Sequence, residues 1–556
     1  MMDRCNNPMA RGACYLLIYL TATYPLHPAI AAGITPDNNR TQVQNQGNVP
    51  VVNIATQAAK SQLAVDTKAL GGMYVNKIRL VATEDGVGVN LKDLTSDQRD
   101  ITLNVNGKIE LGNAKAKTDF NLSARETHIA PNIKVQAERD ITLASTKLDN
   151  KGNVTAGRDM RILGDTLRNT GDKALLQANN NMWLQKDAQG NKSILIENKS
   201  ATIKTVKGDL VVRTNELNNV RSEFVTGWKI QNPDSDKIEY LGFELLFRDH
   251  LNGFKPVLEN TEVKKWFGTV DFNKNNWINT GRKELILSKS TSEAVIFSGG
   301  NMYVNSNKIL NEASSIQALK NVFLTGLILQ NITKNLGVIN YFTKFSTDFN
   351  PLSDTESSRD LIIGLEHLID EFPMYMENDI EFKKTGSANE WENKKYYLAT
   401  ISAGGDLVAD FRDNIDINTP SVSNAKGISE ISGVQRPDAL VARNILLNSK
   451  KINVTDNNIK SVDGINILAG DGIDIKYGSI LAGGDLSMTA TNDINSVQGE
   501  LKGKNITAIS KNADLSFKSS EDTGYFNLDG TRKISSLEAT KLVKSIKAIP
   551  VGSPFN

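Results

Sequence analysis

The chain has 556 residues, and its 64 Lys and Arg against 63 Asp and Glu give a formal net charge of +1. Proteins that bind nucleic acid or an anionic membrane through charge carry a basic excess, so this balance argues against both kinds of partner. Aromatic residues are only 6% of the chain, whereas about one residue in nine is asparagine, which suits turns and stacked side-chain ladders.

The first 31 residues have the form of a secretory signal peptide. A basic region precedes an apolar run from Ala13 to Tyr24, and Ala29-Ile30-Ala31 has the small-x-small form of a cleavage site. Cleavage there would leave 525 residues without Cys5 and Cys14, and so without a disulfide or a cysteine nucleophile. A buried apolar segment is the alternative interpretation. No later stretch approaches the 18 apolar residues of a membrane-spanning helix.

A short phrase recurs along most of the remaining chain: an Asp or Asn, often after glycine, followed by alternating apolar residues. The spacing is 19 residues from Asp140 to Asp159 and 20 residues from Asp485 to Asn505. A period near 20 without a predicted helix indicates a solenoid of strands. The Asp or Asn residues of the phrase are Asp100, Asp140, Asp159, Asn181, Asp209, Asn301, Asn321, Asp406, Asn444, Asn466, Asp485 and Asn505.

The phrase predicts one turn of an all-β, right-handed parallel β-helix with about 20 residues per coil. Ile101, Leu103 and Val105 alternate with polar residues, so they should point into a shared core. We expect the coils to run from about Thr95 to Phe517, with Asp485 and Asn505 on adjacent coils. An antiparallel sandwich is the alternative fold.

Two segments break the period and are expected to leave the stack as irregular insertions. Residues 225–297 contain three of the five tryptophans, and residues 338–398 contain the capping-box pattern Ser353 to Glu356 before an apolar helical spacing from Leu361 to Phe372. These segments either pack onto the stack or form an exposed recognition surface.

Two blocks near the N-terminus resemble the start of large exoproteins of two-partner secretion, above all the filamentous haemagglutinin-like effectors of contact-dependent growth inhibition. The first runs from Pro25 to Pro36 and continues in Val49–Thr56, and the second comprises Val65–Tyr74, Lys77–Leu80 and Thr83–Asn90. The Gly-Gly-Asp-Leu phrases from Asp406 onward are similar to haemagglutinin repeats. The resemblance implies an outer-membrane transporter as a partner and a receptor on neighbouring cells as a possible second one.

The sequence departs from this family in two places. Only Gln57–Ala64 separates the two blocks, so the transport domain looks internally deleted, and no Val-Glu-Asn-Asn motif or toxin domain follows the repeats. We therefore expect the chain to reach the periplasm by its signal peptide and to cross the outer membrane poorly, whereas the family is found outside the cell or on its surface.

The expected organisation divides the chain into eight segments. They are a signal peptide at 1–31, a remnant of the transport domain at 32–94, β-helix repeats at 95–224, an insertion at 225–297, β-helix repeats at 298–337, an insertion with a short helix at 338–398, haemagglutinin-type repeats at 399–520 and a C-terminal tail at 521–556.

No catalytic, cofactor-binding or metal-binding residue is predicted, and no cofactor is expected. His128, His250 and His367 lie in unrelated segments without metal-ligand spacing, and His27 precedes the cleavage site. The single Gly470-Asp471-Gly472 is a weak match to calcium-binding β-helix repeats, which need a repeated nonapeptide.

The first coil is expected to lack a cap and to associate edge to edge, because an unpaired coil presents free backbone N–H and C=O groups. Ile78→Lys or Val81→Lys should then reduce association, while a helix around Leu537–Ile546 could cover the other end.

Three classes of function remain. The leading one is a non-enzymatic, adhesin-like surface protein of the contact-dependent inhibition family. The alternatives are a toxin-delivery effector and a polysaccharide-active β-helix enzyme, which would need a cluster of carboxylates on one face of the coil.

Overall fold

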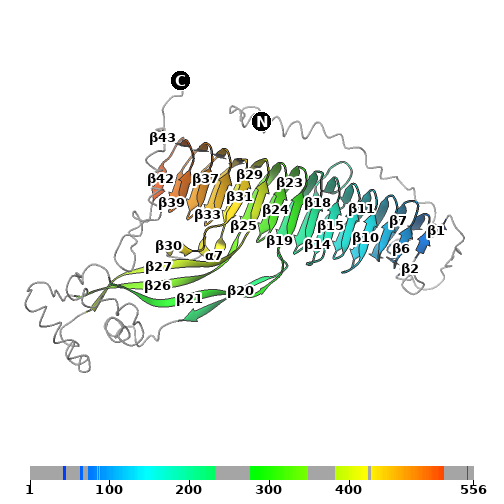
Figure 1. Ribbon diagram of the computed structural model, residues 1–556, viewed down its shortest axis with the longest axis horizontal. Coiled ribbons are helices and arrows are strands. Elements are labelled where there is room, and N and C mark those ends of the chain that lie inside the picture. Colours follow the sequence, from blue (N-terminus) through cyan, green and yellow to red (C-terminus); the bar gives the residue numbers. More distant parts are fainter. Residues whose placement is uncertain are drawn as a thin grey trace, which may run out of the picture.

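The computed structural model describes residues 42–45, 63–66, 73–83, 86, 88–231, 276–347, 382–423, 428–518 and 547–548, which are almost entirely β-strand. The strands form sheets of 24, 14 and five strands, called here the long, short and side sheets. The long and short sheets build a rod, and the side sheet projects from one side of it (Figure 1). The predicted signal peptide and the helices predicted at Leu361–Phe372 and Leu537–Ile546 lie outside the described residues.

The short sheet runs along the whole rod, and its strands pair in chain order. It contains β3 (Met73–Val75), β6 (Leu94–Ser96), β8 (Ala114–Ala116), β10 (Lys134–Ala137), β12 (Asn153–Ala156), β15 (Leu175–Ala178), β18 (Thr202–Thr205), β22 (Val295–Ser298), β24 (Ser315–Ala318), β28 (Thr400–Ala403), β31 (Asp438–Ala442), β34 (Asn458–Ser461), β37 (Ser479–Ala482) and β40 (Glu500–Lys502).

The long sheet wraps around two faces of the rod. It contains β1 (Gln42–Asn45), β2 (Leu63–Asp66), β4 (Ile78–Ala82), β5 (Gly88–Asn90), β7 (Ile101–Leu111), β9 (Phe120–Ile129), β11 (Ile141–Asn150), β13 (Met160–Leu163), β14 (Thr166–Thr170), β16 (Met182–Gln185), β17 (Ser193–Lys199), β19 (Leu210–Val220), β23 (Met302–Glu312), β25 (Val322–Ile332), β29 (Asp406–Asn418), β32 (Asn444–Ser449), β33 (Lys451–Thr455), β35 (Ile465–Ala469), β36 (Ile473–Lys476), β38 (Leu486–Ala490), β39 (Ile494–Val497), β41 (Ile506–Ser510), β42 (Leu515–Lys518) and β43 (Lys547–Ala548).

The side sheet has the strand order β20 (Phe224–Gln231), β21 (Asn276–Ser290), β26 (Lys334–Thr347), β27 (Phe382–Tyr397) and β30 (Ile428–Gly433). One short helix, α7 (Pro420–Ser423), precedes β30 and is the single helix in the described part of the chain.

The rod is a parallel β-helix, which confirms the predicted fold. In a representative coil, β11 pairs in parallel with β13 and with β14, while β12 pairs in parallel with β15. Each coil therefore contributes two segments to the long sheet and one to the short sheet. The predicted register also holds, because Leu486 pairs with Ile506 and Asn505 Nδ2 donates a hydrogen bond of 2.9 Å to Asp485 Oδ1 on the neighbouring coil.

One narrow apolar core runs along the rod. The residues predicted to point inward, Ile101, Leu103 and Val105, are at most 2% exposed, and their counterparts on the following coils are buried with them. Full burial of an aliphatic side chain of this size stabilises the folded state by about 1.5–3 kcal/mol, so stacking of coils supplies the burial that a single coil lacks.

The recurrent Asp or Asn forms a ladder along one corner of the rod. The backbone N–H of Asp159 donates to Asp140 Oδ1 at 3.2 Å, that of Asn181 donates to Asp159 Oδ1 at 3.1 Å, and the same bond joins later pairs up to Asp406 and Asn321. Glycines beside this corner allow close approach: a Cβ on Gly299 would lie 2.0 Å from the Val206 carbonyl oxygen. This packing explains the glycine that often precedes the phrase.

A second ladder, made of six asparagines, runs inside the rod. Each Nδ2 donates to the Oδ1 of the next member at 2.7–2.9 Å, and all six side chains are fully buried. The amides also donate to backbone carbonyls at the adjoining corner, so polar groups that would be costly to bury are satisfied. The members are Asn150, Asn169, Asn198, Asn219, Asn311 and Asn331.

The N-terminal end of the rod differs from the prediction in two ways. Coils begin before Thr95, because Met73 pairs in parallel with Leu94 and Ile78 pairs with Ile101. Ile78 is buried in the core, so Ile78→Lys would disrupt packing instead of testing an exposed rung. The outer edge of β4 is also paired, because β1 joins it antiparallel, with Gln42 opposite Val81.

Candidate functional site

The side sheet is the feature that distinguishes this rod from a plain stack of coils. Its strands come from three excursions out of the rod, which carry β20 and β21, then β26 and β27, then α7 and β30. The coil pairing continues across the excursions: Leu210 pairs with Met302 and Ile316 pairs with Ile401. The segments predicted as irregular insertions therefore supply long, mostly antiparallel strands, because each can pair with the others although it repeats no coil pattern.

The third excursion was missed in the sequence. Asp406 and Asn444 are 38 residues apart, yet they lie on adjacent coils, because Asn444 Nδ2 donates to Asp406 Oδ1 at 2.9 Å. The residues between them make a coil and, in addition, α7 and β30. A spacing of twice the period gave no sign of this excursion.

The side sheet has its own small core around Trp391 on β27. This indole is fully buried among residues that include Leu285, Ile339 and Ile428, and its Nε1 donates to Asn393 Oδ1 at 2.6 Å. Close packing extends to the backbone, because a Cβ on residue 337, a glycine, would lie 2.6 Å from the Trp391 ring. Val422 of α7 and Tyr477 of the rod complete this core, which joins the sheet to the rod.

A buried carboxylate ties β27 to the rod. Asp456, at a corner between β33 and β34, is completely buried and accepts a hydrogen bond of 2.9 Å from the Tyr396 hydroxyl. Its Oδ1 has no hydrogen-bond donor in the described structure, and the nearest cation, Arg436 Nε, lies 3.7 Å away. Burial raises the pKa of Asp456 to about 7, against the opposing effects of Tyr396 and Arg436. Burial also raises the pKa of Tyr396.

A second attachment lies at the same corner one coil further along. Both Asp456 and Tyr477 have left-handed backbones, with φ of 51° and 55°, and the Asp456 N–H donates to the carbonyl of Lys476 on the next coil. The Tyr477 hydroxyl donates to the Ile428 carbonyl oxygen of β30 at 2.7 Å. One corner of two successive coils thus holds two strands of the side sheet.

The base of the first excursion is held by an arginine. Arg221 Nε donates to the Ala313 carbonyl at 3.0 Å, and its guanidinium lies 5.3 Å from the Tyr397 ring centroid. Phe224 meets the same ring edge to face at 4.9 Å. Burial lowers the pKa of Arg221. These contacts fix where β20 leaves the rod.

The outer part of the side sheet exposes large apolar side chains. Val225, Trp228 and Ile230 on β20 are 51%, 47% and 55% exposed, and Ile286 on β21 is 41% exposed. Trp228 also contacts Trp391 edge to face at 6.2 Å between ring centroids. An apolar surface of this kind typically marks a protein interaction site.

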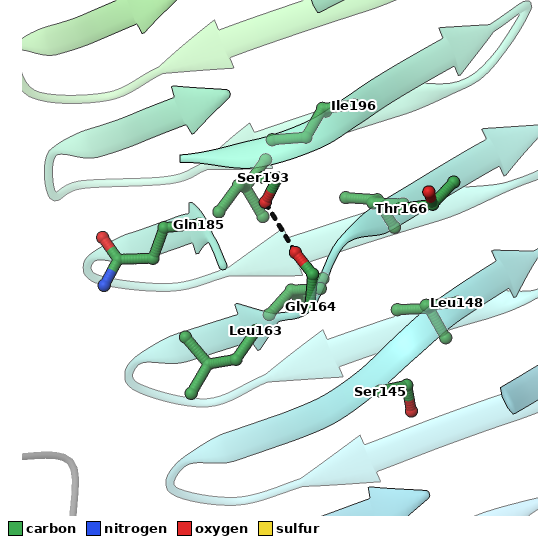
Figure 2. Close-up of a pocket in the computed structure, with 11 residues that line it drawn as sticks. Ser145, Leu148, Leu163, Gly164, Thr166, Gln185, Ser193 and Ile196 are labelled. Atoms are coloured by element: carbon green, nitrogen blue, oxygen red, sulfur yellow. Dashed lines mark hydrogen bonds between the residues drawn. The ribbon is translucent and has the colours of Figure 1, made fainter. Parts of the chain in front are cut away.

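The rod itself offers no room for a substrate. The cavity found between the coils around β11, β13, β14 and β17 measures about 10 Å³, which is about enough for one water molecule. Figure 2 shows that Leu148 and Ile196 are among its lining residues and that Ser193 Oγ donates to the Gly164 carbonyl at 2.7 Å. This cavity is a packing gap inside the core.

Sequence reasoning left the histidines as isolated residues, and stacking changes this for His128. It lies in register between Glu110 and Asp149 of the two neighbouring coils, in an outer row that continues with Arg168 and Glu197. Comparing residues 18–21 positions apart would have found this row. Within the described ranges no three His, Cys, Asp or Glu side chains converge as metal ligands. His250 and His367 fall outside those ranges.

The search for membrane-spanning segments gave a negative result for the described residues: none of their helices has the length and apolar character needed to cross a bilayer.

The fold and the side sheet define the class of protein: a parallel β-helical rod with a lateral, apolar interaction surface. Sequence comparisons name its relatives. A tRNA nuclease CdiA of Yersinia mollaretii is 41% identical over 124 residues, which is 22% of this chain and 4% of the relative. A tRNA nuclease CdiA of Escherichia coli O6:K15:H31 is 26% identical over 349 residues, which is 58% of this chain and 10% of the relative.

A 16S rRNA endonuclease CdiA of Enterobacter cloacae is 35% identical over 151 residues, 27% of this chain and 4% of the relative. The chain belongs to the CdiA/filamentous haemagglutinin-like family of contact-dependent growth inhibition. It spans a tenth or less of the length of these relatives, so their nuclease names describe proteins far larger than the matched segment. No protein-family profile matches the sequence, and no solved structure matches it significantly.

Proposed function

We propose that this chain forms the β-helical stalk of a cell-surface protein that acts through contact between cells, and that the side sheet is its contact surface. The observation that carries the proposal is the projecting sheet with its exposed Trp228, Ile230 and Ile286. The rod suits a spacer: 14 strands of the short sheet, about 4.8 Å apart, extend over about 60 Å.

The proposed route to the surface uses the signal peptide at residues 1–31 and a two-partner-secretion transporter in the outer membrane. The family membership supports this route. The short spacing between Thr56 and Val65 predicts the opposite result, retention in the periplasm. The location of the rod therefore decides whether the stalk can act between cells.

The location can be tested with a single cysteine on the rod. In a Cys5→Ser, Cys14→Ser background, Val462→Cys places a thiol on an exposed corner residue, and Ile467→Cys places one in the core as a matched control. The proposal predicts labelling of Val462→Cys on intact cells by a membrane-impermeant maleimide, only when a cognate transporter is co-expressed. Labelling that requires a permeabilised outer membrane would refute the surface location.

Toxin delivery is the second candidate function, because relatives carry the names tRNA nuclease, deoxyribonuclease and toxin. It predicts that cells displaying the chain reduce the growth of mixed neighbouring cells. Adhesion predicts that labelled neighbours co-sediment with the displaying cells without loss of growth. Replacing Trp228 and Ile286 by serine should reduce co-sedimentation, while Leu319→Ser on the rod, where the leucine is also exposed, should not.

A further inference from the structure

The edge strand β20 has the features of a strand that pairs with another chain. β20 is eight residues long and pairs with β21 along one edge, and no strand of the described part of the chain pairs with its other edge. Natural edge strands are protected by proline, by several charges, by bulges or by shortness. β20 contains no proline and one lysine, and the register shift beside it is an extra residue on β21.

The opposite edge of the side sheet is protected. β30 ends the strand order there, and the rod lies against it, with the Tyr477 hydroxyl bound to the Ile428 carbonyl. Ile428 is 9% exposed, whereas Val225, Trp228 and Ile230 are about half exposed. Only at β20 do free backbone groups and exposed apolar side chains therefore occur together among the described strands of this sheet.

We propose that β20 pairs antiparallel with β20 of a second copy of this chain, joining two side sheets across a two-fold axis. Such an isologous contact closes on itself and gives a dimer. The inference goes beyond the proposed surface role and does not require it, because it concerns the purified chain in solution.

The sequence of β20 is self-complementary in one antiparallel register. Directly opposed residues lie on the same face of a sheet, so a two-fold axis must pass through a residue. With the axis at Gly227, Phe224 opposes Ile230 of the copy and Thr226 opposes Trp228 of the copy. One face of the joint is then lined by large apolar groups continuous with Leu285.

The charges on the strand favour a second copy over a charged partner. Lys229, the only charged residue of β20, lies opposite Glu284 on β21, so opposite charges already face each other within the sheet. In the register centred on Gly227, Lys229 opposes Val225 of the copy instead of another lysine. Like charges therefore do not meet directly, and no acidic partner strand is required.

A cysteine on the symmetry axis tests both the partner and the register. Gly227→Cys in the Cys5→Ser, Cys14→Ser background creates one thiol, and the position accepts a side chain because the nearest atom to its Cβ is Ser288 Oγ at 3.9 Å. Opposed Cα atoms in antiparallel strands lie about 4.5–5.5 Å apart, within the range that disulfides span. Mild oxidation should give a covalent dimer in high yield. Lys229→Cys, four residues from its own copy across the joint, should not crosslink.

The oligomeric state without a crosslink gives a second measurement. Light scattering of the full chain should report twice the 60.9 kDa chain mass, and Ile230→Lys should reduce it to the single-chain mass. Ile230 is largely exposed, so this variant should keep the wild-type strand content by circular dichroism. A monomeric wild-type chain at tens of micromolar, or equal crosslinking of Gly227→Cys and Lys229→Cys, would overturn the proposal.

Discussion

The rod and the side sheet are stabilised in different ways. In the rod, each coil repeats the same few contacts with its neighbours: aliphatic residues inward, an Asp or Asn at the corner and, over six coils, a buried asparagine. In the side sheet, single groups have no equivalent elsewhere, such as Trp391 and the Asp456–Tyr396 pair. Repetition makes the rod tolerant of change at exposed positions, whereas the docking of the side sheet depends on a few particular residues.

The largest effect is expected where the rod brings backbones into contact. A Cβ on Gly164 would lie 1.7 Å from the Ser145 carbonyl oxygen, so Gly164→Ala must displace the neighbouring coil. Overpacking of this kind should lower the free energy of unfolding by about 3 kcal/mol. Gly470→Ala is the matched control, because its nearest atom is 3.6 Å away, and it should change stability by less than about 1 kcal/mol. Denaturant titration followed by circular dichroism distinguishes the two, and equal midpoints would contradict the packing argument.

The next effect concerns the asparagine ladder. Asn219 Nδ2 donates to Asn311 Oδ1 at 2.8 Å and to the Ser315 carbonyl at 3.0 Å, so Asn219→Ala leaves buried acceptors without this donor. We expect a loss of about 2 kcal/mol. Because coils contact only their neighbours, hydrogen exchange should quicken mainly in β17, β19 and β23. Asn305→Ala, on the exposed face of β23, should stay within about 0.5 kcal/mol of wild type, and a uniform change along the rod would argue against local stacking.

A smaller, pH-dependent effect should separate the side sheet from the rod. The unfolded Asp456 releases its proton near pH 4, whereas the buried carboxyl in the folded protein holds it up to about pH 7. The folded state therefore binds more protons across this window, and the stability of the docked sheet should fall as the pH rises from about 4 to 7.

Asp456→Asn should remove this decline and stabilise docking by about 1 kcal/mol at pH 8, because a neutral amide avoids the cost of a buried charge. Hydrogen exchange of β27, corrected for intrinsic rates, is the measurement. Asp413→Asn, at an exposed carboxylate of β29, is the control and should keep the wild-type dependence. An unchanged pH profile in Asp456→Asn would show that another group controls docking.

The smallest effect is expected on the outer charge row of the rod. Arg168 lies 3.5 Å from Glu197 and 3.9 Å from Asp149, and its side chain is substantially exposed. Arg168→Ala should cost less than about 1 kcal/mol, and the cost should shrink in 0.5 M salt because the row is screened by solvent. Lys173→Ala, at an exposed lysine beside the same coils, provides the reference. A salt-independent loss would indicate packing by the arginine stem instead of charge.

The sequence was sufficient to predict the rod because its coils repeat local rules. Alternation placed Ile101, Leu103 and Val105 inside, and the spacing of Asp485 and Asn505 gave the correct register of adjacent coils. The abundance of asparagine pointed to side-chain ladders, although which asparagines are buried became clear only from stacking. The start of the rod was placed too late, because the first coils lack the recurrent phrase.

The side sheet could not be predicted in this way. Its strands pair over long and unequal separations, as when Lys334 pairs with Tyr397, and no period relates them. Trp391 and Asp456 acquire their roles only when three excursions meet, so local patterns carried no signal for either residue. The exposed tryptophan at 228 was identified as a candidate recognition residue, but the edge strand that presents it was not.

The asparagine ladder bears on how the length of such a protein can change during evolution. Neighbouring members are separated by 19, 29, 21, 92 and 20 residues, yet the amide hydrogen bonds that join them measure 2.7–2.9 Å throughout. The geometry of a step is therefore independent of how much chain is looped out within it. Duplication of a coil that carries its own asparagine would lengthen the molecule by about 4.8 Å without altering the bonds on either side. Gene segments encoding whole coils, with or without lateral excursions, can on this basis be gained or lost one at a time.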